Sequence, residues 1–192
     1  MFTGIVEEMG IVESIQSKKN LTLICIKTKK ILPGVKLGDS IAVDGVCLTV
    51  VRKVLAFIYF EAMKETLDAT TVGNWQKGTV VNLERALLST SRLGGHFVTG
   101  HADGVGKITH VGKKENCVSF SLEIPRNLMK FIVLKGSICV NGVSLTVGKV
   151  MADSFEIYII PYTLKESNLG LLKAKDKVNI EIDILARYVL DR

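Results

Sequence analysis

Short runs rich in valine, isoleucine and leucine recur along the chain, separated by segments rich in glycine, asparagine and lysine. Such runs are typical of β-strands, because branched side chains favour extended backbone and the intervening residues favour turns. In the first half, strands are expected at Ile5–Ile15, Leu21–Lys27, Ser40–Val51, Phe57–Glu61 and Val80–Glu84. Two polar stretches, Met63–Thr71 and Tyr162–Leu169, look helical instead. The pattern therefore predicts an all-β protein with a few short helices.

The central strand region occurs twice in the sequence. Residues 39–50 read DSIAVDGVCLTV and residues 136–147 read GSICVNGVSLTV, and eight of the twelve aligned positions are identical. At the same offset of 97, residues 81–84 (VNLE) recur as residues 178–181 (VNIE). Self-similarity at a fixed offset identifies the chain as a tandem duplication.

A polar, glycine-rich segment at Ser89–Gly95 joins the two copies. We therefore expect an N-terminal domain at 1–96 and a C-terminal domain at 97–192. About six strands in roughly 90 residues would leave two bare sheet edges unless each sheet closes on itself. Two similar small barrels in tandem are the predicted architecture.

The last ten residues, Asp183–Arg192, predict a short helix. One face of this helix collects the apolar residues Ile184, Leu185, Tyr188 and Val189. A helix of this length is only marginally stable by itself. Its apolar face is therefore expected to pack against something, for example another subunit.

The composition is that of a globular chain, with 47% hydrophobic and 23% charged residues, and it excludes a disordered protein. Apolar runs such as Leu55–Phe60 are far shorter than the roughly 20 residues of a membrane-spanning helix, so no membrane partner is expected. The start of the chain carries Glu7 and Glu8 where a secretory signal would carry basic residues. These features predict a cytoplasmic protein.

Neither the charge nor the cysteines point to a nucleic-acid, zinc or disulfide-rich class. The net charge is +6, but the basic clusters are short and scattered, and no basic stripe with interleaved aromatic residues occurs. The four cysteines lack the close spacing of zinc sites and the density of disulfide scaffolds. Free thiols and a small polar ligand, with no nucleic acid and no metal, are the prediction.

The densest polar cluster is Gly94–Gly104, which reads GGHFVTGHADG. His96 and His101 are five residues apart, so a strand would direct them to opposite faces and no shared metal site is expected. The glycines allow the backbone to approach a flat ligand, and an imidazole such as that of His101 can transfer protons near neutral pH. The alternative is that both histidines are ordinary turn or surface residues.

Cys47 and Ser144 occupy equivalent positions of the two copies, shortly after the turns Asp44-Gly45 and Asn141-Gly142. One interpretation is structural, because alternate strand residues simply face a core and cysteine is common there. The other is functional, because two near-identical barrels with equivalent but chemically different polar groups would suit two similar ligands. The spacing alone leaves both interpretations open.

Six motifs together resemble the riboflavin synthase family over essentially the whole chain. They are MFTGIV at residues 1–6, the duplicated GVCLTV and GVSLTV, GGHFVTGHADG at 94–104, MKETL at 63–67, IPYTL at 160–164 and VNIEID at 178–183. The resemblance implies two six-stranded Greek-key barrels and a C-terminal helix, assembled as a homotrimer. It also implies a reaction between two molecules of 6,7-dimethyl-8-ribityllumazine, without metal or organic cofactor, at a site between the N-terminal barrel of one subunit and the C-terminal barrel of its neighbour.

The resemblance further implies one set of ligand-binding residues in each barrel. The first barrel's pocket would use Gly4, Ile5, Val6, Ser40, Cys47, Leu48, Thr49, Glu61, Ala62, Met63, Lys64, Glu65 and Thr66. The second would use Gly100, His101, Ala102, Lys135, Ser144, Leu145, Thr146, Tyr158, Ile159, Ile160, Pro161, Tyr162 and Thr163. Among these, His101, Ser144 and Cys47 are the candidate catalytic residues, with His101 for proton transfer and Cys47 as nucleophile or ring-positioning group. Asp183 is a weaker candidate.

A non-catalytic relative that binds a lumazine or flavin as a light-emitting antenna would share the duplicated barrels. Such relatives tend to lose the polar pattern of one barrel and the histidine-rich joint, and this sequence keeps both. A purely structural barrel trimer would need neither feature. The sequence therefore favours the enzyme.

Overall fold

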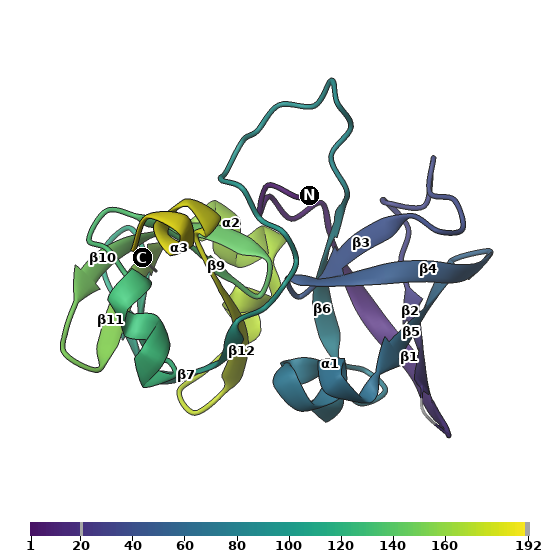
Figure 1. Ribbon diagram of the computed structural model, residues 1–192, viewed down its shortest axis with the longest axis horizontal. Helices are drawn as coiled ribbons and strands as arrows, with labels where there is room; N and C mark the ends of the chain where they lie inside the picture. Colours follow the sequence, from purple (N-terminus) through teal and green to yellow (C-terminus); the bar gives the residue numbers. More distant parts are fainter. Residues whose placement is uncertain (20, 191–192) are drawn as a thin grey trace.

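The computed structural model describes residues 1–19 and 21–190, whose strands close into two antiparallel barrels (Figure 1). The first barrel consists of β1 (Glu8–Lys18), β2 (Leu21–Lys27), β3 (Ser40–Val43), β4 (Val46–Val54), β5 (Phe57–Met63) and β6 (Val80–Arg85). The second consists of β7 (Gly104–Lys113), β8 (Val118–Glu123), β9 (Ser137–Val140), β10 (Val143–Val150), β11 (Ser154–Ile159) and β12 (Lys177–Ile182). The tandem barrels predicted from the repeat are confirmed.

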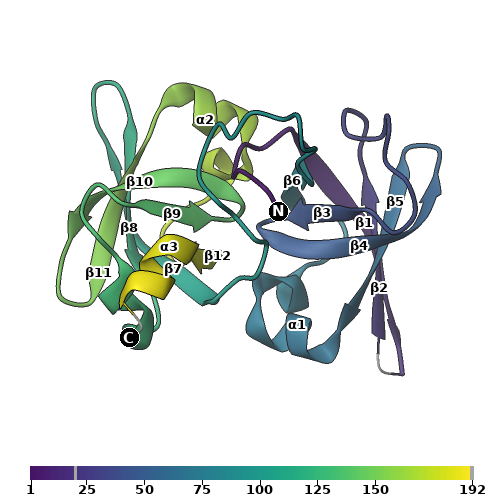
Figure 2. The ribbon, with the colours of Figure 1, turned by 45° about the horizontal axis from the view of Figure 1, so that its top comes forward.

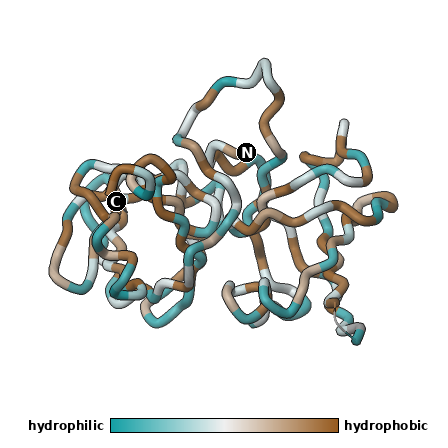
Figure 3. The backbone as a smooth tube through the Cα atoms, viewed as in Figure 1, coloured by the Kyte–Doolittle hydropathy of each residue, from teal (hydrophilic) through white to brown (hydrophobic). Residues whose placement is uncertain are grey.

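Both barrels have the same strand order. Around the first, the order is β1-β2-β5-β4-β3-β6, and around the second it is β7-β8-β11-β10-β9-β12. In each, three strands joined by hairpins follow one another, and an earlier strand lies beside the last of them, which is a Greek-key connection. Hydrophobic positions recur along the strands of both barrels (Figure 3). The largest fully buried side chains are Phe2, Phe60, Phe120, Phe155, Ile24, Ile26, Ile31, Ile41, Ile58, Leu83, Ile108 and Leu122.

Each central run is a hairpin of two strands. Asp44 and Gly45 separate β3 from β4 with positive φ angles of 46° and 76°, and Asn141 and Gly142 do the same in the second copy with 46° and 77°. Asx-Gly dipeptides favour this left-handed conformation, so the expected single strand Ser40–Val51 is interrupted where the sequence places its turn signal.

The short helices lie close to where the polar stretches predict them. The stretch at 63–71 contains α1 (Lys64–Ala69) and the start of the 3₁₀ turn η1 (Thr71–Asn74). Its counterpart, predicted at 162–169, overlaps α2 (Pro161–Glu166), which begins one residue earlier, and includes part of η3 (Asn168–Leu171). A further 3₁₀ turn, η2 (Arg126–Phe131), follows β8 in the second barrel, whereas the corresponding residues 29–34 of the first copy form no such turn.

The C-terminal helix is also present, as α3 (Ile184–Leu190), while residues 191–192 of the predicted helix lie outside the described part. Ala186 packs against the core of the second barrel. Most of the predicted apolar face does not, because Leu185, Tyr188 and Val189 are 58%, 72% and 70% exposed. Within a single chain this face remains uncovered.

Buried side-chain amides join the two barrels. Asn82 of β6 donates through Nδ2 to the carbonyl of Asn141 (2.8 Å), and its Oδ1 accepts from the backbone N–H of Asn168 (2.7 Å). From the other side, Asn179 of β12 donates through Nδ2 to the carbonyl of Asp44 (2.9 Å). Because these groups are buried, their partners fix how the barrels are oriented.

The two hairpin turns touch at the centre of this contact between the barrels, which we call the seam. A Cβ atom on Gly45 would lie 2.7 Å from the backbone nitrogen of Gly142, and one on Gly142 would lie 2.8 Å from the nitrogen of Gly45. Both glycines are therefore required by the approach of the turns as well as by their φ angles.

The carboxylate of Asp44 lies in this seam. Oδ1 of Asp44 accepts from the backbone N–H of Asn82 (2.7 Å) and from Nδ2 of Asn168 (2.9 Å). Burial raises the pKa of Asp44 to about 8, against the opposing effect of these two hydrogen bonds. The equivalent position of the second copy holds the neutral Asn141, which makes the seam chemically asymmetric.

Replacing Asp44 by Asn should remove one pH-dependent component of stability. In the folded state Asp44 keeps its proton up to about pH 8, whereas in the unfolded chain it loses the proton above about pH 3.8. The contribution of Asp44 to the free energy of unfolding therefore falls as the pH rises from about 3.8 to about 8. Asp44→Asn keeps the Oδ1 acceptor and has no proton to lose. Urea unfolding between pH 4 and 8 should show wild-type stability falling relative to the variant, with the exposed Asp68→Asn as control. Parallel curves for wild type and Asp44→Asn would contradict this account.

Candidate active site

Two segments of the chain cross between the barrels. The carbonyl of Gly4, which precedes the first barrel, accepts from the backbone N–H of Ser144 on β10 of the second barrel (2.8 Å). The carbonyl of Gly100, which precedes the second barrel, accepts from the N–H of Cys47 on β4 of the first (2.8 Å). Val6 accordingly packs against the second core and Ala102 against the first. Each barrel thus receives the segment that leads into the other.

The crossing segments also pair with each other. Phe2 and Val98 exchange two backbone hydrogen bonds of 2.7 and 3.2 Å, and both side chains are completely buried. The N-terminal segment and the linker run between the two barrels, as Figure 2 shows. The structure therefore explains why β1 begins at Glu8 instead of the predicted Ile5, because the residues before Glu8 belong to the crossing.

A buried carboxylate holds each crossing segment. Glu84 of β6 accepts from the N–H and hydroxyl of Thr3 (both 2.7 Å) and from the N–H of Gly4 (2.9 Å). Glu181 of β12 accepts from the N–H and hydroxyl of Thr99 (2.6 and 2.8 Å) and from the N–H of Gly100 (2.9 Å). Burial raises the pKa of both carboxyls, while these hydrogen bonds act in the opposite direction.

Ser144 is hydrogen-bonded to a histidine that the candidate list from the sequence omits. Nδ1 of His96 lies 2.7 Å from Oγ of Ser144, and His96 is buried, with Nε2 lacking a partner among the described residues. Burial lowers the pKa of His96, although the charge of Asp183 opposes the shift. The ring is therefore neutral at pH 7 and able to share a proton with Ser144.

The surroundings of Ser144 leave no spare volume on the crossing side. A Cβ atom on Gly95 would lie 2.1 Å from the carbonyl oxygen of Thr3 and 3.0 Å from Oγ of Ser144. A glycine before His96 is therefore what allows the imidazole to reach the serine. This glycine-rich segment was the only sequence signal for His96, since spacing does not reveal what a side chain faces.

Cys47 and His101 lie at the corresponding place of the first barrel. Cys47 is half-buried, and a Cβ atom on Gly100 would lie 2.6 Å from its Cβ. The next residue, His101, is exposed, and its backbone N–H donates to Oγ1 of Thr99 (3.3 Å). The structure therefore brings His101 and Cys47 to the same region and pairs Ser144 with His96.

The crossing residues contact the barrel opposite to the one whose pocket the resemblance assigned them to. The resemblance assigned Gly4, Ile5 and Val6 to the first barrel's pocket and Gly100, His101 and Ala102 to the second's. The backbone contacts reverse this at Gly4 and Gly100, and the core contacts reverse it at Val6 and Ala102. The cause is the exchange of segments, which a linear motif cannot reveal.

Most other predicted residues lie on β4, β5, β10 and β11 or at the starts of α1 and α2. The exposed ones are Thr49, Glu61, Met63, Lys64, Glu65, Lys135, Thr146, Tyr158, Ile160, Pro161 and Tyr162. Ser40, Thr66, Leu145 and Thr163 are half-buried. The side chains of Leu48, Ala62 and Ile159 are buried in the barrel cores, so only their backbone groups are available to a ligand. Asp183 accepts from the N–H of Leu185 (2.9 Å) at the start of α3.

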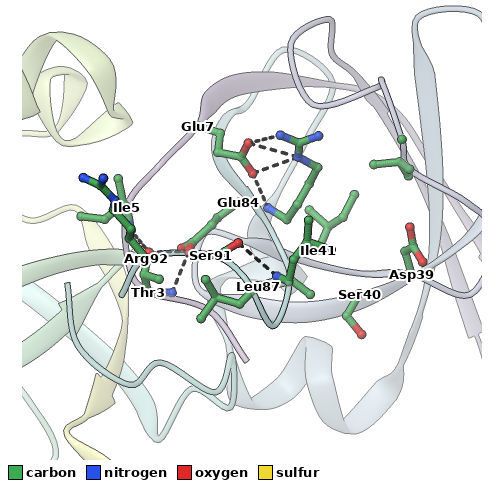
Figure 4. Close-up of a pocket in the computed structure, with 15 residues that line it drawn as sticks. Thr3, Ile5, Glu7, Asp39, Ser40, Ile41, Glu84, Leu87, Ser91 and Arg92 are labelled. Carbon is green, nitrogen blue, oxygen red and sulfur yellow. Dashed lines mark hydrogen bonds and ion pairs between the residues drawn. The ribbon is translucent and has the colours of Figure 1, made fainter. Parts of the chain in front are cut away.

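A cavity of about 570 Å³ opens beside the first barrel (Figure 4). It is lined by the Glu7–Arg85 ion pair, by Arg92 of the linker, and by Ile5 and Ser40 from the predicted set. Cys47, Ser144 and His101 do not line it. The cavity therefore meets the first crossing segment at Thr3, Ile5 and its carboxylate Glu84, but it does not reach the candidate catalytic residues.

Residues 3–86 and 99–183 each match the family model described as lumazine binding domain. The riboflavin synthase of Bacillus subtilis (strain 168) is 44% identical over 189 residues, which cover 98% of this chain and 88% of that protein. The chain belongs to the riboflavin synthase family. Family members from Actinobacillus pleuropneumoniae and Brucella abortus (strain 2308) are each 42% identical over 98% of this chain, covering 88% and 96% of their own lengths.

Solved structures of LumP have the same fold as this member of the riboflavin synthase family. LumP complexed with 6,7-dimethyl-8-(1'-D-ribityl) lumazine has a TM-score of 0.86 at 30% identity, and LumP complexed with riboflavin has 0.88 at 31%. Both matches cover 95% of this chain and 99% of LumP.

Two further observations concern the described residues alone. None of their helices combines the length and the apolar character that crossing a membrane requires. No group of three or more His, Cys, Asp or Glu side chains among them is arranged to hold a metal ion.

The histidine paired with Ser144 should titrate below the ordinary histidine value of 6.5, because burial disfavours the imidazolium. NMR of the ring protons against pH measures this directly, since the chain has only three histidines. His101→Gln and His110→Gln identify the other two signals. A signal of His96 that titrates at or above 6.5 would show that its ring is not held neutral.

Proposed function

We propose that the chain catalyses the riboflavin synthase reaction. Two molecules of 6,7-dimethyl-8-ribityllumazine exchange a four-carbon unit and yield riboflavin and 5-amino-6-(D-ribitylamino)uracil. The observation that carries this proposal is the 44% identity to the Bacillus subtilis enzyme over 98% of the chain. The duplication supports it, because a reaction between two like molecules needs two similar binding places.

In the proposed complex each barrel holds one lumazine. Backbone groups of the crossing segments at Val6 and Ala102 are suited to the pyrimidinedione edge, and the exposed hydroxyls of Thr49 and Thr146 are suited to the ribityl chains. Holding both rings face to face converts a bimolecular step into an effectively unimolecular one, which is worth up to about 7–11 kcal/mol. Neither a metal nor an organic cofactor is part of the proposal.

The polar groups near each ring have distinct proposed roles. The 7-methyl group of the lumazine is unusually acidic, so a modest base such as the accessible imidazole of His101 is sufficient. Ser144 shares a proton with the neutral ring of His96 and acts on the lumazine of the second barrel. Cys47 serves as nucleophile or ring-positioning group in the first.

The proposal includes a homotrimer in which the site lies between the N-terminal barrel of one subunit and the C-terminal barrel of its neighbour. The exposed apolar face of α3, formed by Leu185, Tyr188 and Val189, supports an assembly that covers it. A cytoplasmic location remains a prediction from the sequence.

A second candidate function is binding without catalysis. LumP, which was solved with a lumazine and with riboflavin, has the same fold and is 30–31% identical. The identity to the named synthases is higher, at 37–44%, and favours catalysis.

Incubating the purified chain with 6,7-dimethyl-8-ribityllumazine alone should produce one riboflavin and one 5-amino-6-(D-ribitylamino)uracil for every two molecules consumed. Absorbance and chromatography follow both products, and added chelator should not change the rate. Tight binding with an unaltered lumazine spectrum after long incubation would contradict the enzyme and favour the antenna.

Substituting His101 by Ala should lower turnover by about 10²-fold or more while changing lumazine affinity far less, because proton transfer contributes mainly to the chemical step. The exposed His110, on β7, provides the matched control His110→Ala, which should leave both quantities unchanged. Equal losses of turnover and affinity in His101→Ala would reduce this residue to a binding contact.

A further inference from the structure

Glu84 and Glu181 each lie in one barrel and hold a segment that contacts the other barrel. Glu84 belongs to β6 of the first barrel and receives three hydrogen bonds from Thr3 and Gly4. The carbonyl of that same Gly4 then receives the backbone N–H of Ser144, on β10 of the second barrel. A series of hydrogen bonds thus runs from Glu84 of the first barrel to Ser144, the candidate catalytic serine of the second.

An equivalent series of hydrogen bonds runs from the second barrel to the first. Glu181 of β12 in the second barrel receives three hydrogen bonds from Thr99 and Gly100. The carbonyl of Gly100 receives the backbone N–H of Cys47 in the first barrel. The two copies therefore use identical contacts, and each carboxylate lies in a different barrel from the strand it supports.

Close packing restricts the movement of the segments at Gly4 and Gly100 relative to the strands that they contact. A Cβ atom on Gly4 would lie 2.7 Å from both Cβ and N of Ser144, and one on Gly100 would lie 2.6 Å from Cβ of Cys47. Both glycines have positive φ angles, of 76° and 81°. A displacement of either segment is therefore passed on to the strand it touches instead of being absorbed by an intervening gap.

We infer that Glu84 is a positioning residue for the lumazine held by the second barrel, and Glu181 for the lumazine held by the first. This inference rests on the proposed function. Glu→Gln tests it with little change of volume. In the variant, one of the two oxygens that accept backbone N–H groups becomes an amide donor, so one N–H of the segment faces another donor and the segment must move.

The experiment assigns each bound ligand to a barrel before the carboxylates are changed. The probe is a ¹³C-labelled ribityllumazine with a 7-oxo group in place of the 7-methyl, which has no methyl proton to lose and so does not react. NMR of the bound probe should give two signals. Thr49→Ala and Thr146→Ala, at equivalent positions on β4 and β10, identify the signals of the first and second barrels.

Glu84→Gln should weaken probe binding at the second barrel, whose signal Thr146→Ala identifies, by about tenfold. This is the size of a lost hydrogen bond to a charged group. The other signal should keep its affinity within about twofold. Glu181→Gln should do the reverse. An effect of each variant on the signal of its own barrel, equal effects on both signals, or no effect on either would overturn the inference.

Thermal unfolding of the variants separates misfolding from misplacement. If a glutamine variant does not fold, Thr3→Ala and Thr99→Ala remove one hydrogen bond from each carboxylate and carry the same crossed expectation. A wild type that binds no probe at all would contradict the proposed function and this inference with it. Two probe signals in the wild type, with each glutamine variant affecting the signal of its own barrel, would contradict this inference but not the proposed function.

Discussion

The contact between the turns at Gly45 and Gly142 is the constraint on which the rest of the structure depends. Each glycine lies so close to the backbone of the other that a methyl group has no room, and amide hydrogen bonds from Asn82 and Asn179 surround the contact. With the barrels fixed in this way, the short segments at Gly4 and Gly100 can reach the opposite barrel. The geometry around Ser144 and Cys47 is a product of both barrels together.

The duplication is close in its framework and divergent in its chemistry. Glu84 and Glu181 make matching hydrogen bonds, yet Cys47 stands where the second copy has Ser144. The C-terminal helix adds a further difference. Glu7 pairs with Arg85 of its own barrel, whereas the equivalent Asp103 pairs with Arg187 of α3. A shared framework with different polar groups suits two identical substrates that must play different parts in one reaction.

The sequence predicted the features that depend on local pattern. Branched residues in short runs indicated the strands, and the Asp44-Gly45 and Asn141-Gly142 dipeptides marked the turns, because both signals act within a few residues. The repeat at an offset of 97 then indicated two like barrels. Cys47 and Ser144 were recognised as equivalent positions for the same reason.

Features that depend on which distant segment a residue meets could not be predicted. Val6 continues an apolar run, and nothing in that run shows that its side chain packs on the second core. His96 has the same local surroundings as His101, but only the folded chain places it on Ser144. The amphipathic pattern of α3 predicted its apolar face correctly, but a pattern within one helix does not specify what covers that face.

The most direct test of this account is a crystal structure of the protein with an unreactive ribityllumazine analogue. The account predicts two bound rings per chain, one against the second barrel at Thr146 and the segment at Gly4–Val6, and one against the first barrel at Thr49 and the segment at Gly100–Ala102. Rings bound between each barrel and its own leading segment, or only in the cavity beside Ser40 and Arg92, would contradict it.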